Sequence, residues 1–194
     1  MSCTVIIPLQ AMPTIFTHPA VPLAIFRAFP PEAITPGVVV TGVLCSSLPD
    51  IDVLGFGFGI QYGDLLGHRG LTHSIAFSLF VAGAAAFLLT GQRRQTFRTV
   101  FAFLFLATFS HGVLDAMTNG GLGIAFLSPF TNHRYFFPWR PIEVSPIGIR
   151  VFDRRMIEVV ASELRWVWMP ACALFLIAPT ARRMWVIRAG HRGL

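Results

Sequence analysis

The stretch Thr72–Ala116, "THSIAFSLFVAGAAAFLLTGQRRQTFRTVFAFLFLATFSHGVLDA", contains two long apolar runs joined by a short arginine-rich segment. The first run extends over His73–Gly91 and the second over about Thr99–Met117. Each run is close to the roughly 20 apolar residues that a helix needs to cross a bilayer. Because the segment Gly91–Arg98 between them is short and polar, we expect an antiparallel hairpin of two membrane-spanning helices.

The composition of the whole chain also predicts a membrane protein. Of its 194 residues 54% are hydrophobic, only 12% are charged, and the mean hydropathy is +0.66. A soluble domain of this length would need more polar residues to cover its surface. The net charge of +6 comes from arginines that are spread through loops and chain ends. This spread favours anionic lipid headgroups, and thus the bilayer, over nucleic acid as a partner.

Three further apolar segments complete the predicted fold. Ser162–Thr180 has tryptophans near its start and arginines after its end, a pattern typical of a span anchored at the membrane interface. The pieces His18–Phe29 and Gly37–Leu48 are joined by "PPEAITP", and each is too short to be assigned as a span. We interpret these two pieces as a half-inserted hairpin packed against the other helices.

The remaining segment, Thr118–Asp153, is rich in glycine, proline and aromatic residues and predicts a long irregular loop. The predicted fold class is therefore all-α: a polytopic membrane helical bundle with a long irregular aromatic loop. We expect residues 1–194 to form a single membrane-embedded domain.

Ionisable residues are predicted to gather at one end of this bundle. His73 begins the first apolar run, whereas His111 and Asp115 lie near the end of the second, so an antiparallel hairpin brings them together. His111 and Asp115 are four residues apart, and side chains at this spacing share one face of a helix. The pair can therefore point at one ion.

The two shorter apolar pieces extend this cluster. Asp50 and Asp52, in "LPDID", follow the second piece, and His18 begins the first, so an antiparallel arrangement places all three at the same level. Seven of the 15 His, Asp and Glu residues of the chain then lie at one membrane face: His18, Asp50, Asp52, His68, His73, His111 and Asp115. Ionisable groups so close to membrane spans are candidates for function.

Neutral imidazoles and carboxylates are the usual ligands of catalytic zinc. We therefore predict a site for one to three divalent ions, Zn²⁺ first and Mn²⁺ second, with all seven residues as candidate ligands. Two simpler roles stay open for these residues: a histidine at a helix end can be an interfacial residue, and "PDID" can simply end a helix in a turn.

Catalytic and substrate-binding roles are assigned to fewer residues. Asp52 is either a ligand or a group that orients a histidine. Arg69 is expected to bind a substrate phosphate through two hydrogen bonds, and Asp52 and Arg69 are the predicted catalytic residues. Arg134 and Arg140 either bind substrate as well or anchor the loop at the interface. His133 and Glu143 lie in the same loop and are candidates for a general acid or base.

The sequence resembles the YdjM-type family of membrane-bound metal-dependent hydrolases in an ordered set of motifs. These are "THPA", "LPDID", "HRGLTHS", "SHGVLDAMTNGG" and "SPF". The resemblance implies a helical inner-membrane protein with a divalent-metal hydrolase site, whose ligands are His18, Asp50 or Asp52, His68 or His73, His111 and Asp115. More distantly, the series of ligands is similar to that of the zinc-dependent phospholipase C and S1/P1 nuclease group. That similarity implies hydrolysis of a phosphoester.

We accordingly predict a multi-pass inner-membrane hydrolase that acts on a phosphoester, plausibly a lipid, at the membrane surface. The alternatives are a metal-binding membrane protein without catalysis and a transporter, although a transporter would favour charged groups near the middle of the bilayer. Arginines at the end opposite the site predict that the site faces away from the cytoplasm.

Overall fold

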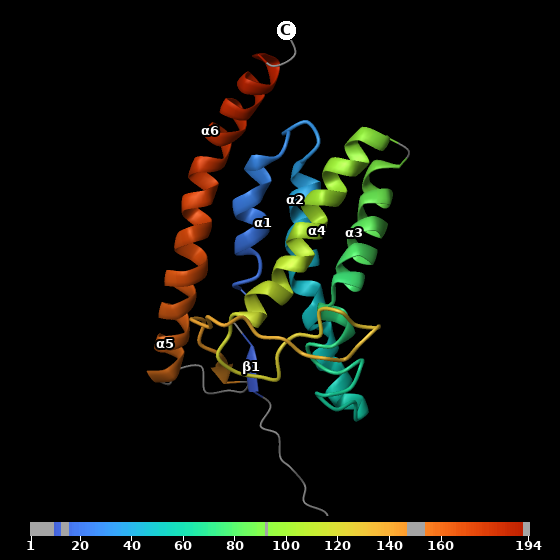
Figure 1. The fold of residues 1–194 in the computed structure, drawn as a ribbon, viewed down its shortest axis with the longest axis vertical. Helices are drawn as coiled ribbons and strands as arrows, with labels where there is room; N and C mark the ends of the chain where they lie inside the picture. Colours follow the sequence, from blue (N-terminus) through green and yellow to red (C-terminus); the bar gives the residue numbers. More distant parts are fainter. Residues whose placement is uncertain (1–9, 13–15, 92, 147–153, 192–194) are drawn as a thin grey trace, which may run out of the picture.

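The computed structural model describes residues 10–12, 16–91, 93–146 and 154–191 and consists of a helical bundle (Figure 1). Its helices are α1 (Ala20–Ile25), α2 (Pro36–Ser47), α3 (Ile75–Thr90), α4 (Arg94–Ala116), α5 (Arg154–Glu163) and α6 (Met169–His191). Four short helical segments extend or connect them: η1 (Phe26–Ala28), η2 (Leu48–Phe58), η3 (Leu71–His73) and the π-helical turn η4 (Leu164–Trp168). The strands β1 (Gln10–Met12) and β2 (Ser145–Pro146) form a small antiparallel pair. The predicted membrane helical bundle is confirmed.

Helices α2, α3 and α4 form the centre of the bundle. The side chain of Thr35 caps α2, which has Pro36 at its first position, and the side chain of Ser74 caps α3 by accepting from the Phe77 amide at 3.1 Å. Gly42 lets α2 approach α4, because a Cβ atom there would lie 2.6 Å from the Phe103 ring. The buried apolar core between these helices is formed by Ile34, Val38, Ala82, Ala86, Val100, Phe103 and Leu104.

Three helical segments are long and apolar enough to cross a membrane: Pro36–Phe58, Thr96–Ala116 and Arg155–Met184. The second and third confirm two of the predicted spans. The prediction for His73–Gly91 needs correction, because the helix there is only the 16 residues of α3. Such a helix is about 24 Å long, less than the roughly 30 Å of a hydrocarbon core. Helix α3 begins only after its capping residue, Ser74, and it ends at Thr90, before Gly91.

The Gly37–Leu48 piece, too short by itself to be assigned as a span, is part of a longer helical segment. The chain continues beyond Ser47 as the 3₁₀ helix η2, and the combined segment has 23 residues. The other short piece does remain short, since α1 and η1 together end at Ala28. Helix α1 packs against α6, α4 and α2 and runs antiparallel to α2, as the proline-rich turn predicted.

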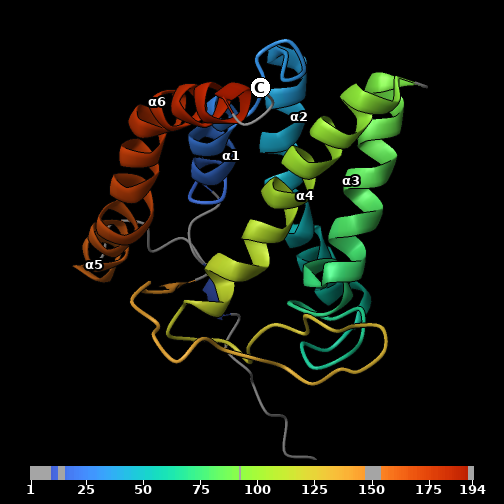
Figure 2. The same ribbon diagram turned by 45° about the horizontal axis from the view of Figure 1, so that its top comes forward.

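One end of the bundle gathers the starts of α1 and α3 and the ends of α2 and α4 (Figures 1 and 2). The long loop that follows α4 crosses the same end, and it is irregular up to residue 146, as predicted. Isolated bridges, Thr118 to Ile142 and Ile124 to Tyr135, fold it back on itself. The rest of the predicted loop, 147–153, lies outside the described residues. We call this end of the molecule the site end.

Candidate metal centre

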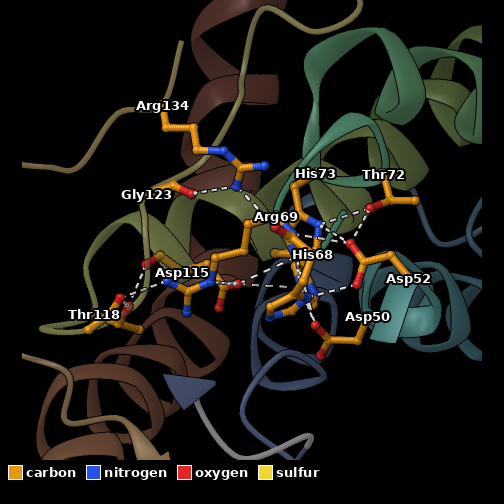
Figure 3. A network of polar contacts seen from close by, with 12 residues as sticks. Asp50, Asp52, His68, Arg69, Thr72, His73, Asp115, Thr118, Gly123 and Arg134 are labelled. Atoms are coloured by element: carbon orange, nitrogen blue, oxygen red, sulfur yellow. Dashed lines mark hydrogen bonds and ion pairs between the residues drawn. The ribbon is translucent and has the colours of Figure 1, made fainter. Parts of the chain in front are cut away.

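All seven histidines and aspartates predicted as ligands lie together at the site end. They come from four segments: the turn before α1, the helix η2, the loop and helix η3 before α3, and the last turns of α4. Figure 3 shows several of these side chains converging from different elements. Five of the seven are nearly inaccessible to solvent: His18, His68, His73, His111 and Asp115. Buried ionisable groups need partners, and their arrangement identifies those partners.

The ring of His111 is held in one tautomer by the backbone. Its Nδ1 lies 2.8 Å from the carbonyl oxygen of Ser46, and a carbonyl can only accept a hydrogen bond. Nδ1 therefore carries the proton, and the lone pair of Nε2 points into the cluster. The carbonyl oxygen of Ser46 can accept from His111 because Pro49, three residues further along the turn, has no N–H group to donate to it.

The ring of His73 is fixed in the same way by a carboxylate. Its Nδ1 lies 3.2 Å from Asp52 Oδ2, so its Nε2 also faces the cluster. There it lies only 3.0 Å from Nε2 of His111. Two lone pairs at this distance repel each other unless a proton or a cation lies between them. The arrangement therefore calls for a positive charge at this point.

Two carboxylates complete a four-residue group around that point. Asp50 Oδ1 lies 3.3 Å from Nε2 of His111 and 3.7 Å from Nε2 of His73. Asp115 Oδ2 lies 3.4 Å from Nε2 of His73 and 3.9 Å from Nε2 of His111. Four ligands placed tetrahedrally about 2.0–2.1 Å from a zinc ion would be about 3.3–3.4 Å apart. The observed spacings fit such an ion after shifts of a few tenths of an ångström.

His18 adds a fifth side chain to this group. Its ring stacks on that of His111 with the centroids 3.7 Å apart. Its Nε2 lies 3.9 Å from Asp115 Oδ1 and 4.0 Å from Asp50 Oδ2, but neither ring nitrogen makes a hydrogen bond within the described part of the chain. Burial, with the neighbouring His111 next, lowers the pKa of His18 to about 3. The ring is therefore neutral at physiological pH and able to bind a metal.

His73 titrates in the opposite direction. Burial lowers its pKa, but hydrogen bonds that the ring donates to Asp115, Asp50 and Asp52 outweigh burial and raise it to about 10. Without a metal, His73 therefore holds a proton among these carboxylates. A divalent ion would displace that proton and take over the same partners.

Asp52 organises a second group behind the first. Its Oδ1 accepts from Nδ1 of His68 at 2.7 Å, and its Oδ2 lies near Nδ1 of His73 and the amide of Arg69. Asp52, His68 and His73 are thus close enough to share an ion of their own. However, both oxygens of Asp52 already accept hydrogen bonds from the rings, as a carboxylate that orients metal-binding histidines does. The Nε2 atom of His68 is buried and has no hydrogen-bond partner among the described residues.

Arg69 is fully buried beside the cluster. Its Nε lies 3.1 Å from Asp115 Oδ2, and its Nη1 donates to the carbonyl oxygen of Gly120 at 2.9 Å. Its backbone has a φ of 63°, a conformation that costs free energy in a residue other than glycine. Two backbone hydrogen bonds hold it there: its amide donates to Asp52, and its carbonyl accepts from Ala125.

Arg134 and Arg140, the other predicted substrate-binding arginines, lie in the long loop. Arg134 donates to the carbonyl oxygens of His68 and Tyr62, each at 2.9 Å, and so fastens the long loop to the segment that carries His68. Arg140 is exposed and lies over the ring of Phe136, with its guanidinium carbon 4.7 Å from the ring centroid. Their roles in substrate binding stay predictions.

His133 and Glu143 contact other parts of the loop. His133 is exposed, and its ring lies against Tyr135. Glu143 accepts from Asn119 and pairs with Arg155 of α5 at 3.5 Å. These contacts do not join either residue to the cluster of histidines and aspartates.

The sequence reasoning missed two side chains of the site. Thr72 donates to Asp52 Oδ2, and its hydroxyl lies 3.0 Å from Nδ1 of His73; its place directly before His73 was a usable signal. Tyr62 is buried, with the edge of its ring against His68 and the ring centroids 5.2 Å apart. Nothing in the sequence around Tyr62 indicated this position.

Comparisons with known proteins identify the family of the chain. Residues 12–189 match the family described as YdjM inner membrane protein. This chain belongs to the YdjM family. It is also 38% identical over 164 residues to "Inner membrane protein YbcI" of Escherichia coli (strain K12), which covers 84% of this chain and 95% of that protein. No solved structure matches. The family and the three candidate spans support an inner-membrane location, while the similarity to phospholipase C and S1/P1 nucleases stays a prediction.

Proposed function

We propose that this YdjM-family protein is a membrane-bound, divalent-metal-dependent hydrolase that cleaves a phosphoester at the membrane surface. One observation carries the proposal: two buried Nε2 atoms, each fixed by a hydrogen bond at the opposite ring nitrogen, converge with two carboxylate oxygens at 3.0–3.9 Å. Buried acceptors that face one another need a proton or a cation between them, and a divalent ion would take the place of the proton on His73.

The donor atoms of the cluster are imidazoles and carboxylates, as in catalytic zinc centres, whereas structural zinc sites use mainly cysteine thiolates. His18, Asp50, His73, His111 and Asp115 would hold the ion, zinc being the best match to two or three imidazoles with carboxylates. A divalent ion bound in such a site supplies Lewis-acid chemistry, acidifying water and polarising a phosphoryl oxygen. Asp52 keeps the lone pair of His73 on the metal side, and Arg69 offsets the charge of Asp115.

A substrate at the membrane surface is supported by the apolar side chains that surround the site end. Phe58 at the end of η2 is 86% exposed and Phe130 in the long loop is 90% exposed. Other exposed apolar residues on η2, on the loop between η2 and η3 and on the long loop are Ile51, Leu54, Leu65, Leu66 and Leu127. Because η2 continues a membrane span, these side chains would meet lipid. A lipid phosphoester could then reach the centre without crossing the hydrocarbon core.

The distribution of arginines supports a site on the extracytoplasmic side. Arg27, Arg93, Arg94 and Arg98 lie at the end opposite the site, where α1 and α3 end and α4 begins. By the positive-inside rule this end would face the cytoplasm. Arg134, Arg140 and Arg155 at the site end reduce the asymmetry without reversing it.

A metal-binding role without catalysis is the second candidate, since the same ligands bind an ion whether or not turnover follows. A transport role is less well supported because the ionisable groups gather at the helix ends rather than midway along them.

The test compares purified, zinc-loaded wild-type protein with Asp115→Asn and His111→Ala in detergent or liposomes. The substrates are a phospholipid, an isoprenoid phosphate and a nucleotide, and zinc content and helical structure are measured in parallel. We expect wild-type activity that a chelator abolishes, and a loss of more than about a hundredfold in both variants, since partners behind the ligands alone are worth about 10- to 100-fold. Asp64→Asn, on an exposed loop, is the matched control. Zinc-loaded wild-type protein that releases product from none of the substrates would favour the non-catalytic role.

A further inference from the structure

Tyr62 presents a buried hydroxyl group beside the metal centre. The residue is only 7% exposed, and its hydroxyl hydrogen has no acceptor within the described part of the chain. Burial raises the pKa of Tyr62, while Arg69 and the Leu122 amide act in the opposite direction. The amide is a donor, so the hydroxyl hydrogen still has no acceptor. Leaving such a donor unpaired costs free energy, so this position favours a bound group that accepts a hydrogen bond.

The positive charge of Arg69 lies next to this hydroxyl. A Cβ atom at Gly121 would lie 2.6 Å from Nη1 of Arg69 and 2.7 Å from the Tyr62 hydroxyl oxygen, so both groups pack against the backbone at Gly121 and lie next to each other. Arg69 also contacts Asp115 of the cluster at 3.1 Å. The hydroxyl, the guanidinium and the metal ligands therefore follow one another along one wall of the site.

The segment that passes over these two groups is built from glycines. Gly121 and Gly123 both have a positive φ, 83° and 82°, which residues with a side chain rarely adopt. At Gly121 a side chain would also collide with Arg69 and Tyr62. Glycine at this position therefore lets the two polar groups approach the backbone side by side.

We propose that Tyr62 and Arg69 form an anion subsite in which the Tyr62 hydroxyl donates a hydrogen bond to a phosphoryl oxygen of the substrate. This inference rests on the proposed function, because the anion is the phosphoester that the metal centre cleaves. Arg69 supplies charge from a position fixed by Asp115 and Gly120, and Tyr62 supplies a neutral donor that keeps its proton at physiological pH. Tyr62 thus becomes a substrate-binding residue of the site.

The test measures binding of inorganic phosphate to zinc-loaded protein, freed of unbound zinc, by ³¹P NMR or calorimetry, together with kcat and KM. Tyr62→Phe should weaken phosphate binding and kcat/KM by about 10-fold to 100-fold, the range for one hydrogen bond to a charged acceptor, with zinc content unchanged. Tyr135→Phe, an exposed tyrosine of the long loop, should bind phosphate like wild type. Gly121→Ala should weaken phosphate binding, because its Cβ atom would displace Arg69 and the Tyr62 hydroxyl, whereas Gly63→Ala, with open space around its Cβ position, should not.

Three outcomes separate this inference from the proposed function. Tyr62→Phe protein that binds phosphate and turns over like wild type overturns the subsite, even if hydrolysis is established. Wild-type protein that binds no phosphate also overturns it. If wild-type protein cleaves none of the substrates but binds phosphate in a Tyr62-dependent way, the hydrolase proposal fails and the anion subsite stands.

Discussion

The two halves of helix α4 bury side chains of different chemistry. On the half that starts near Arg94, the fully buried side chains are apolar: Val100, Phe103, Leu104 and Ala107. On the half that ends at Ala116, polar or ionisable side chains are buried beside Leu114 and Ala116: Thr108, His111 and Asp115. Along one face of one helix, a packed apolar core gives way to a cluster of charges.

This contrast separates residues that hold the helices together from residues kept for chemistry. Apolar packing needs no partner beyond close contact, and the Phe103 ring meets Phe29 edge-on with the centroids 5.6 Å apart. The polar half buries Asp115, and the turn before α1 buries His18 beside it, without satisfying all of their polar atoms, which costs free energy unless an ion or ligand is bound. The polar half is therefore the part of α4 that function must explain.

The largest expected effect on stability comes from the apolar half. Phe103→Ala should lower the free energy of unfolding by about 3 kcal/mol, the low end of the range for Phe→Ala in protein cores. The effect is at the low end because lipid rather than water surrounds much of helix α4 once it separates from its neighbours. Zinc content per folded protein should not change. Denaturant unfolding in detergent measures the stability, and zinc analysis of the folded fraction measures the metal content. Loss of zinc from folded Phe103→Ala protein would show that the apolar half of α4 also contributes to metal binding.

Asp52→Asn tests the orientation of the rings of His68 and His73 beside the polar half of α4. The oxygen of an asparagine side chain can accept a hydrogen bond from only one of the two rings, His68 or His73. Its NH₂ group would face Nδ1 of the other ring as a donor. The proton of that ring would then move from Nδ1 to Nε2, the nitrogen on the metal side. We expect zinc affinity to fall by about 10- to 100-fold with little loss of stability. Competition with a chelator of known affinity measures this fall. Asp64→Asn serves as the control, and equal affinities in the two variants would exclude an orienting role for Asp52.

The smallest expected effect is the pH dependence of zinc binding. His73, with a pKa of about 10 in the metal-free protein, is protonated at pH 7 and must lose that proton to bind zinc. Zinc affinity should therefore rise with pH from 6 to 8, by up to about tenfold per unit for one displaced proton. His18, with a pKa of about 3, is already neutral and adds nothing. Calorimetry in two buffers of different ionisation enthalpy counts the protons released when zinc binds. Phe103→Ala, the control, should release the same number. Zinc binding without proton release would contradict the protonated state of His73 in the metal-free protein.

The membrane bundle and most of the candidate site could be predicted from the order of residues alone. Apolar runs near the length of a bilayer indicated the spans, and the spacing of His111 and Asp115 placed both on one helical face, because the period of a helix is a local property. The alternation of chain direction through short polar turns then brought His18, Asp50 and His73 to the same end. Local periodicity did not reveal that α2 continues through the glycines of η2, or that α3 is too short to match the other spans.

The packing of distant segments, by contrast, sets which nitrogen of each ring faces the cluster and which charge lies beside which. The proton on His111 Nδ1 depends on the Ser46 carbonyl, 65 residues away in the chain. The contact between Arg69 and Asp115, like the buried hydroxyl of Tyr62, depends on how the loops fold over the helix ends. No local pattern encodes such contacts, because their geometry arises only when the packed helices fix the positions of the segments that carry them.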